Sequence, residues 1–375
     1  MKTLRLELTD YKKTGCLSTA DEAALRQGAE LLRNGGLVAF PTETVYGLGG
    51  NALLPDASRN IYAAKGRPSD NPLIAHIASM KELPSIVKCV PLQAKRLADA
   101  FWPGPLTMIL EKSGIVPYET TGGLNTVAVR MPEHPAARRL IELAGVPIAA
   151  PSANTSGRPS PTEALHVLED LDGKIDAVID GGSVPIGVES TIVDLSGAQP
   201  VLLRPGAVTR EMLSEALGEA VSADPALEKP LDPSVYPKAP GMKYRHYAPK
   251  APMCIFVPED GRFSEAALIR IEQSVSAEAE QKLASGLYVG ILCSDETLPY
   301  YKERFSYIGE KRVLLMSAGS HRSDESFAHN LFRVLREMDD AGIGFIVAEG
   351  TDTEKIGYAV MNRMKKAAGQ QVRYI

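Results

Sequence analysis

Cysteine is scarce in this sequence, and its four copies are scattered. Cys16, Cys89, Cys254 and Cys293 form no C-x-x-C pair in the chain of 375 residues. Disulfide frameworks and cysteine-ligated zinc sites need closely spaced cysteines, so we expect neither, and a reducing compartment is favoured. No segment approaches the roughly eighteen unbroken apolar residues of a membrane-spanning helix, and the N-terminus lacks an apolar core of signal-peptide length. We therefore expect a cytoplasmic protein without membrane association.

An excess of basic charge is absent as well. Lys and Arg number 41 against 46 Asp and Glu, which gives a formal net charge of −5 and a pI near 5.8. A dedicated nucleic-acid-binding protein usually has a basic footprint, which this composition does not provide. Local basic clefts are still compatible with these totals, because the field in a cleft depends on the arrangement of charges and not on their sum.

Several common catalytic and nucleotide-binding motifs are missing. The sequence has no G-x-x-x-x-G-K-[ST] phosphate loop and no G-x-S-x-G nucleophile elbow, and no second His or Cys lies at metal-ligand spacing from His76. The stretch GLGGNA, residues 47–52, formally satisfies G-x-G-x-x-A. It is a weak match, because the acidic residue expected about twenty positions later is Asp70, which lies in a turn and not at a strand end. We therefore expect any nucleotide to be bound by a site that uses neither a phosphate loop nor a dinucleotide-binding glycine motif. We also expect no metal held by protein ligands.

The length and the pattern of the chain predict two domains joined by a linker. Residues 1–227 have a mixed α/β pattern. Residues 228–252 contain six prolines and one glycine, and proline disfavours helix in the residue before it, so an extended linker is expected. In residues 253–375, short apolar runs alternate with helical stretches, which predicts a small parallel α/β sheet. Helices are expected in the first domain at residues 20–36, 56–66, 92–102 and 134–145.

Four basic residues lie in a turn or beside strand ends, where an ordinary solvent-exposed charge is out of place: Lys65, Arg67, Arg130 and Arg204. Arg offers a planar fork that suits carboxylate or phosphate, and Lys offers a mobile point charge. The alternatives are an exposed turn for Lys65 and Arg67, and a carboxylate partner at a sheet edge for each arginine. Because four such residues occur together, chance is a weaker explanation of their positions, and an anion-binding cleft is the other interpretation.

Hydroxyl and amide side chains are concentrated in residues 150–162, APSANTSGRPSPT. Taken alone, this composition favours a loop that caps the helix expected from about residue 161. Together with the basic residues it is compatible with a polyanion cradle built without a phosphate loop. His76, alone on an apolar strand, is more typical of a buried core histidine than of a catalyst.

Six motifs over residues 41–208 occur in the order found in one known family. They are PTETVYGLG, KGRPSDNPL, RMP, PSANTSGRPSPT, ESTIVD and LRPGAV. Together with PGMKYRHYAP in the linker and the α/β tail, they resemble the YrdC/Sua5 family of threonylcarbamoyl-adenylate synthases, in its long two-domain form. The resemblance implies a YrdC-like twisted mixed sheet with helices in the first domain, and a smaller Rossmann-like parallel α/β domain after it.

The resemblance also implies an activity. Members of this family form threonylcarbamoyl-AMP and pyrophosphate from L-threonine, bicarbonate and ATP, so the protein is expected to be a nucleotidyltransferase. A separate tRNA threonylcarbamoyl transferase complex then modifies adenosine 37 of tRNA, and we expect transient contact with it. Mg²⁺ is expected to arrive with ATP, held by phosphates and water and not by a protein cage.

The functional residues of the family fall on matching positions of this sequence. The K-x-R plus S-x-N tetrad corresponds to Lys65, Arg67, Ser152 and Asn154, which are expected to be catalytic. ATP or the adenylate is expected to be held by Arg67, Asn71, Thr126, Ser152, Ser160, Arg204 and, from the linker, Tyr236. Threonine is expected to be held by Thr44, His76, Arg130, the backbone at Ala150, and Ser190. Every reactant except the amine is an anion, so catalysis is expected to depend on positioning and charge neutralisation, with Arg130 clamping the threonine carboxylate.

Two other functions fit parts of the sequence. The first domain of the family is also similar to double-stranded-RNA binders, so a tRNA-binding module without synthase activity is the main alternative. The acidic pI disfavours it weakly, and weak direct contact with tRNA is also compatible with a synthase. A carbamoyl-transfer enzyme of the hydrogenase-maturation type shares this domain, but such chains carry zinc-finger segments, which the scattered cysteines exclude.

The linker, residues 228–252, is too aromatic and too basic for a passive spacer. Tyr236 precedes a proline that stiffens its backbone. We expect the segment to close over the cleft of the first domain as a lid, with Tyr236 touching the nucleotide phosphates. The alternative is a solvated tether.

Overall fold

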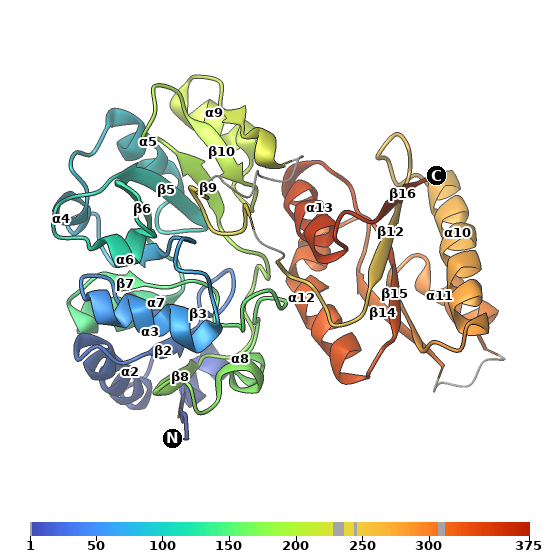
Figure 1. Ribbon diagram of the computed structural model, residues 1–375, viewed down its shortest axis with the longest axis horizontal. Coiled ribbons are helices and arrows are strands. Elements are labelled where there is room, and N and C mark those ends of the chain that lie inside the picture. Colours follow the sequence, from blue (N-terminus) through green and yellow to red (C-terminus); the bar gives the residue numbers. More distant parts are fainter. Residues whose placement is uncertain (1, 228–235, 244–245, 307–311) are drawn as a thin grey trace. The chain divides into compact units, whose positions relative to one another are not determined.

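The computed structural model describes residues 2–227, 236–243, 246–306 and 312–375 (Figure 1). Its internal contacts divide the chain into two compact units: Met1–Ser156 with Ser160–Tyr244, and Gly157–Pro159 with Arg245–Ile375. Part of the expected linker therefore lies outside the described residues. The domain boundaries expected at residues 227 and 252 stay a prediction.

The first unit is built on a mixed sheet with the strand order β1-β8-β2-β3-β7-β4-β6-β5-β9-β10-β11. Parallel and antiparallel pairs both occur, since β4 runs parallel to β6 and antiparallel to β7. The strands are β1 (Leu4–Glu7), β2 (Val38–Phe40), β3 (Gly47–Asn51), β4 (Ile74–His76), β5 (Leu106–Glu111), β6 (Thr126–Arg130), β7 (Ile148–Ala149), β8 (Ala177–Asp180), β9 (Thr191–Asp194), β10 (Val201–Arg204) and β11 (Ser222–Ala223). The expected mixed α/β sheet is confirmed.

The first unit contains helices that pack through apolar faces. The helices are α1 (Thr9–Thr14), α2 (Thr19–Arg33), α3 (Pro55–Lys65), α4 (Leu83–Ile86), α5 (Leu92–Phe101), α6 (Tyr118–Thr121), α7 (Pro135–Ala144), α8 (Ala164–Leu171) and α9 (Arg210–Leu217), with a 3-10 turn at Pro225–Leu227. Helices α2, α7 and α9 begin at a side-chain cap. A capping box between Ser18 and Asp21 starts α2. The apolar face of α2 meets α7 in one buried cluster, which includes Leu25 and Leu140. The four helices expected in this part of the sequence are confirmed as α2, α3, α5 and α7.

Two expectations about loops are settled by the fold. The stretch that formally matched a dinucleotide motif is the buried strand β3, antiparallel to β2, and not a strand-to-helix turn. A Cβ at Gly49 would lie 2.8 Å from the Phe40 ring and 3.0 Å from the Val38 carbonyl oxygen, so glycine is needed there for close strand packing. Helix α8 begins after Glu163 without a side-chain cap. The capping alternative for residues 150–162 is therefore wrong.

The second unit is a smaller α/β domain whose sheet is parallel throughout. The strand order is β14-β13-β15-β12-β16, and each neighbouring pair is parallel. The elements are β12 (Met253–Val257), α10 (Glu265–Ala284), β13 (Val289–Ser294), α11 (Leu298–Arg304), β14 (Val313–Gly319), α12 (Asp324–Asp340), β15 (Phe345–Glu349), α13 (Lys355–Ala367) and β16 (Val372–Tyr374). Ile271 and Val275 of α10 pack against Ile291 and Val347 of the sheet. The expected Rossmann-like parallel domain is confirmed.

In the described part of the chain, no helix combines the length and the apolar character needed to cross a membrane.

Candidate active site

Lys65 is the last residue of α3, and its ammonium group points into the first unit. Gly66 ends the helix in the left-handed conformation, with φ 60°, which glycine adopts without strain. The Lys65 side chain is buried, and its Nζ donates hydrogen bonds to the backbone carbonyl oxygens of Ser152 and Asn154. The exposed-turn alternative does not fit this burial.

Arg67 follows the same turn and is buried as well. Its Nε donates to the carbonyl oxygen of Asn71 at 3.1 Å and its Nη2 to that of Pro72 at 3.0 Å. Both acceptors lie in the segment that leads into β4. The guanidinium is thus fixed by backbone oxygens, in a position set by the turn after α3.

Ser152 and Asn154 complete the tetrad and contact each other directly. Ser152 Oγ donates to Asn154 Oδ1 at 2.5 Å, and Asn154 Nδ2 donates to the carbonyl oxygen of Thr155 at 2.8 Å. Lys65 bonds to the backbone of both residues. The structure therefore brings three members of the expected tetrad into one hydrogen-bonded group, with Arg67 two residues from Lys65.

Strands β4, β6 and β7 bring the expected threonine ligands together. The register places His76 beside Arg130 on one side and Ile148 on the other. Arg130 Nη1 donates to Thr44 Oγ1 at 2.9 Å. Ala150 donates its N–H to the Ile74 carbonyl oxygen at 2.9 Å, so its expected role would fall to its own carbonyl oxygen.

His76 is a buried and uncharged histidine near neutral pH. Its Nδ1 lies 3.0 Å from the carbonyl oxygen of Ile74. Burial and the neighbouring Arg130 charge lower the pKa of His76 to about 3. The imidazole can therefore act as a hydrogen-bonding group near neutral pH, and it adds no positive charge to the site.

Ser190 connects the threonine ligands to Arg204. Its Oγ lies 2.8 Å from Thr107 Oγ1, and Thr107 is paired with Arg130 across β5 and β6. Arg204 Nε donates to the Ser190 carbonyl oxygen at 3.0 Å and Nη2 to Ser190 Oγ at 3.1 Å. Arg204 ends β10 and is buried, so these expected ligands of two different substrates lie side by side.

Thr126 and Arg130 mark the two ends of one strand. Thr126 begins β6 and Arg130 ends it, a separation of about 13 Å at the usual rise per residue. A ligand that touched both would have to be elongated. That length suits a nucleotide joined to a small acyl group, and the role of Thr126 stays a prediction.

Residues 236–243 of the linker pack on the first unit. Ala239 and Met242 lie in a buried cluster with Ile74 and Ala128, and the Lys243 ammonium lies 3.4 Å from a carboxylate oxygen of Asp70. Tyr236 is 63% exposed. The packing of Ala239 and Met242 does not fit a solvated tether over this stretch, while residues 228–235 and 244–245 lie outside the described residues.

The sequence did not indicate that two buried glutamates belong to this site. Glu43 contacts Arg130 at 2.6 Å, and Glu189 accepts a hydrogen bond from Ser160 Oγ at 2.5 Å. Both lie inside quoted motifs, PTETVYGLG and ESTIVD. Their partners are far away along the chain, so no local pattern indicated them.

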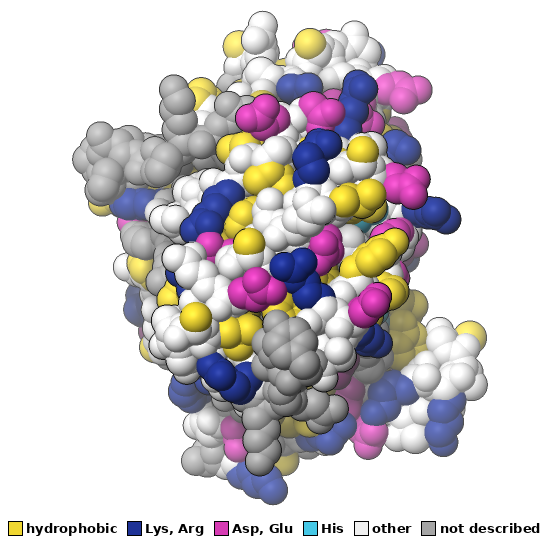
Figure 2. Space-filling view, turned by 90° about the vertical axis from the view of Figure 1, so that its right-hand side faces the viewer, with side chains coloured by type: hydrophobic (Ala, Val, Ile, Leu, Met, Phe, Trp, Pro, Cys, Tyr) yellow, Lys and Arg dark blue, Asp and Glu magenta, His cyan; other side chains and the backbone are white. Residues whose placement is uncertain are grey.

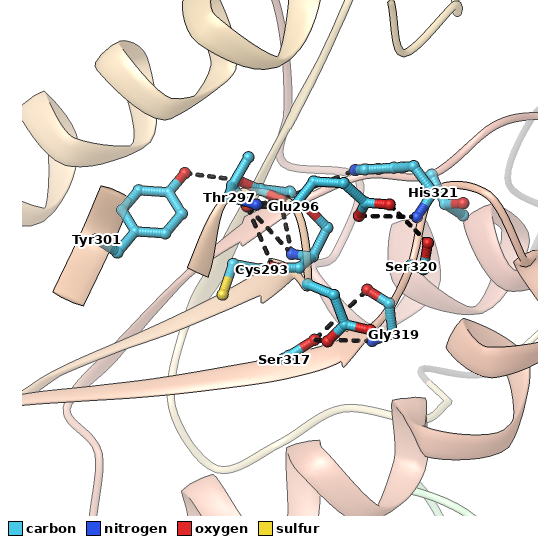
Figure 3. A network of polar contacts seen from close by, with 12 residues as sticks. Cys293, Glu296, Thr297, Tyr301, Ser317, Gly319, Ser320 and His321 are labelled. Carbon is cyan, nitrogen blue, oxygen red and sulfur yellow. Dashed lines mark hydrogen bonds and ion pairs between the residues drawn. The ribbon is translucent and has the colours of Figure 1, made fainter. Parts of the chain in front are cut away.

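A second group of polar side chains lies at the carboxyl ends of the strands in the second unit (Figure 3). Glu349 ends β15 with its side chain fully buried. It accepts hydrogen bonds from Ser294 N at 2.8 Å, Thr297 Oγ1 at 2.8 Å and Tyr301 Oη at 2.6 Å. These three donors satisfy the carboxylate from within the fold, which indicates a stabilising role.

The described residues contain no group of three or more His, Cys, Asp or Glu side chains that could hold a metal ion.

Family models match both halves of the chain. The Sua5/YciO/YrdC model, described as telomere recombination, matches residues 30–206. A model described as the C-terminal domain of threonylcarbamoyl-AMP synthase matches residues 208–369.

Individual proteins are similar over nearly the whole chain. The threonylcarbamoyl-AMP synthase of Pyrococcus abyssi is 47% identical over 352 residues, which cover 94% of this chain and 96% of that protein. The synthase of Bacillus subtilis is 44% identical over 375 residues, with 99% of each chain covered. A crystal structure of P. abyssi Sua5 complexed with L-threonine superposes with a TM-score of 0.85 at 44% identity, covering 100% of both chains.

Proposed function

This chain belongs to the YrdC/Sua5 family of threonylcarbamoyl-AMP synthases, and from that premise we propose that it forms threonylcarbamoyl-AMP and pyrophosphate from L-threonine, bicarbonate and ATP. It is then a nucleotidyltransferase that supplies the activated group for modification of adenosine 37 in tRNA. The full-length similarity to synthases does not favour the alternative of an RNA-binding module without synthase activity.

The observation that carries this proposal is the hydrogen-bonded tetrad region around Lys65. Its ammonium is buried and held by the carbonyl oxygens of Ser152 and Asn154. A buried cation is costly unless it has partners or a charged ligand to offset. We assign Lys65 and Arg67 to the negative charge that develops on the carbamate and on the phosphates during transfer.

We assign the rest of the nucleotide site to side chains on either side of this tetrad. They are Asn71, Thr126, Ser160, Arg204 and Tyr236. Arg204 and Ser160 are buried and held by fixed hydrogen bonds, which supports binding groups that need little reorganisation when the nucleotide enters.

We assign threonine to the opposite end of β6. Arg130 would bind its carboxylate, and Thr44, His76, Ser190 and the Ala150 carbonyl would surround its hydroxyl, methyl and amine. The neutral state of the His76 ring supports a role in accepting or donating one hydrogen bond there, without competing for the carboxylate.

The chemistry then needs two bond-forming steps. The neutral amine of threonine attacks the carbon of bicarbonate, and water leaves to give a carbamate. A carbamate oxygen attacks the α-phosphorus of ATP, the bond to the β-phosphate oxygen breaks, and pyrophosphate leaves. The protein contributes alignment of the three substrates and neutralisation of their negative charge.

Mg²⁺ would be bound mainly by the ATP phosphates and by water, where it would neutralise phosphate charge. We also propose that the segment around Tyr236 closes over the nucleotide. The packing of Ala239 and Met242 on the first unit supports that arrangement.

Contacts with other macromolecules are proposed to be transient. On the face drawn in Figure 2, Lys and Arg side chains lie interspersed with Asp and Glu. We propose weak direct contact with tRNA at most, and passage of the product to a separate transferase. We propose a cytoplasmic location, as expected for a tRNA-modifying enzyme.

The test is ATP consumption and pyrophosphate release by the purified protein, with threonine and bicarbonate each omitted in turn. The proposal requires that one pyrophosphate is released for each ATP consumed. It also requires that neither change occurs when threonine or bicarbonate is omitted. Salt-sensitive tRNA binding without ATP cleavage would support the RNA-binding alternative.

A further inference from the structure

Glu43 lies against Arg130 inside the proposed threonine site. Its Oε1 accepts a hydrogen bond from Arg130 Nη2 at 2.6 Å, and each of the two side chains is 5% exposed. Its Oε2 accepts the backbone N–H of Glu133 at 3.1 Å. The carboxylate is therefore fixed at both oxygens, at the same depth as the guanidinium.

Stability alone does not account well for a buried pair of this kind. Removing two charges from water costs about as much as their attraction returns. Arg130 has five N–H groups, and the described residues accept three of them, through Glu43, Thr44 and the Gly104 carbonyl. One N–H on each terminal nitrogen is left over, and these two can donate hydrogen bonds to the oxygens of a ligand.

Near neutral pH, the Glu43–Arg130 pair and the two histidines close to it have a net charge close to zero. Burial alone would raise the pKa of Glu43, but the charge and hydrogen bond of Arg130 lower it below its usual value, so this carboxylate is ionised. Burial and the Arg130 charge lower the pKa of His76 to about 3. Burial lowers the pKa of His134 to about 4. Neither imidazole then adds a positive charge.

The other end of the cleft is built differently. The contacts of Lys65 and Arg67 described above go to carbonyl oxygens, which carry no formal charge. Arg130 instead contacts a full carboxylate. These contacts thus differ in the formal charge of their acceptors.

We propose that Glu43 makes the Arg130 end of the cleft selective for a zwitterionic amino acid over phosphate-like anions. This role rests on the proposed function. The carboxylate of an amino acid meets the two remaining N–H groups of Arg130, and its ammonium group offsets the charge of Glu43 before the amine loses its proton. A sulfate or phosphate brings two negative charges beside Glu43 and nothing to offset it. Glu43 thereby keeps ATP phosphates and pyrophosphate out of the threonine position.

The first experiment uses the wild-type protein. Threonine-dependent ATP consumption is measured with and without sodium sulfate at constant ionic strength. Sulfate should leave the KM for threonine unchanged, and competition between sulfate and threonine would overturn the inference. No threonine-dependent ATP consumption at all would instead overturn the proposed function, before any variant is examined.

The second experiment compares three variants. Glu43→Gln should raise the KM for threonine about tenfold or more, because a buried charge loses its partner. It should change the KM for ATP by less than about twofold, because Glu43 lies in the proposed threonine site and not among the proposed ATP ligands. It should also make sulfate a competitive inhibitor of threonine. Glu43→Asp keeps the charge and should stay insensitive to sulfate. Glu22→Gln removes a partly exposed pair with Arg139 and should behave as wild type.

Sulfate competition separates specificity from a merely structural role, which would not create a new anion site. A folded Glu43→Gln protein with unchanged threonine KM and no sulfate competition would overturn the inference. If circular dichroism shows that Glu43→Gln does not fold, the wild-type and Glu43→Asp measurements decide, and sulfate competition in either would overturn it.

Discussion

Lys65 Nζ donates a hydrogen bond to the backbone carbonyl oxygen of Ser152, 87 residues further along the chain. This contact joins the end of α3 to the loop after β7. It holds a cation beside Ser152 Oγ and the Asn154 amide, which contact each other. The first prediction follows from the position of this ammonium.

Lys65→Ala should lower kcat/KM for threonylcarbamoyl-AMP formation by at least about tenfold. The reason is that loss of a preorganised charge at the site of transfer costs roughly 2–4 kcal/mol of transition-state stabilisation. The same loss is expected for Arg67→Ala. Steady-state kinetics should be run beside a thermal melt, and near-normal rates in a well-folded Lys65→Ala protein would contradict the assignment.

Threonine should be preferred over serine and glycine. Thr44 and Ser190, two of the proposed threonine ligands, are buried, so the missing methyl group of serine should cost about 1–3 kcal/mol in kcat/KM. Glycine lacks the hydroxyl as well and should be poorer still. The measurement is kcat/KM for the three amino acids at fixed ATP and bicarbonate, and equal values would rule out this pocket.

Acid should destabilise the fold through His76. Above about pH 6.5 the histidine is neutral in both the folded and the unfolded chain, so it adds no pH dependence. As the pH falls from there toward 3, the unfolded chain binds a proton that the folded state excludes, since burial lowers the pKa of His76 to about 3. The free energy of unfolding should then fall by up to about 1.4 kcal/mol per pH unit from this group.

His76→Phe should make that pH dependence shallower. Urea unfolding at pH 7, 5.5 and 4.5 measures the slope for both proteins. Identical slopes would mean that His76 is protonated in the folded state over this range.

Glu349→Ala should destabilise the second unit by about 3 kcal/mol, because three buried donors lose their acceptor. The donors are Ser294 N–H and the hydroxyls of Thr297 and Tyr301. Urea unfolding followed by circular dichroism tests this, with Glu303→Ala, an exposed position on α11, as the matched control. Equal stability of the two variants would contradict the structural role.

Chelation should act on the substrate and not on the fold. EDTA should abolish ATP consumption, and added Mg²⁺ should restore it, because the metal enters with the nucleotide. The unfolding temperature of the protein without ATP should not change, since its described residues offer no metal cluster. A lower unfolding temperature in EDTA would reveal a resident metal.

Much of the local structure was predictable from the sequence because its causes are local. The capping box of α2 joins Ser18 to Asp21, and the turn that presents Lys65 and Arg67 depends on Gly66 between them. The alternation of apolar runs and helical stretches after residue 252 was enough to predict a parallel sheet. Periodicity and capping act within about four residues, so they can be recognised without the fold.

The contacts of the site depended on tertiary structure. Arg130 meets Glu43, 87 positions before it, and Ser160 meets Glu189, 29 positions after it. Sequence alone identified the arginine as a basic residue beside a strand end and the serine as part of a hydroxyl-rich stretch, but it did not identify their carboxylate partners. Those pairings depend on the order of strands in the sheet and on which loops meet at its ends. The packing of the whole unit sets that order, and no local pattern carries it.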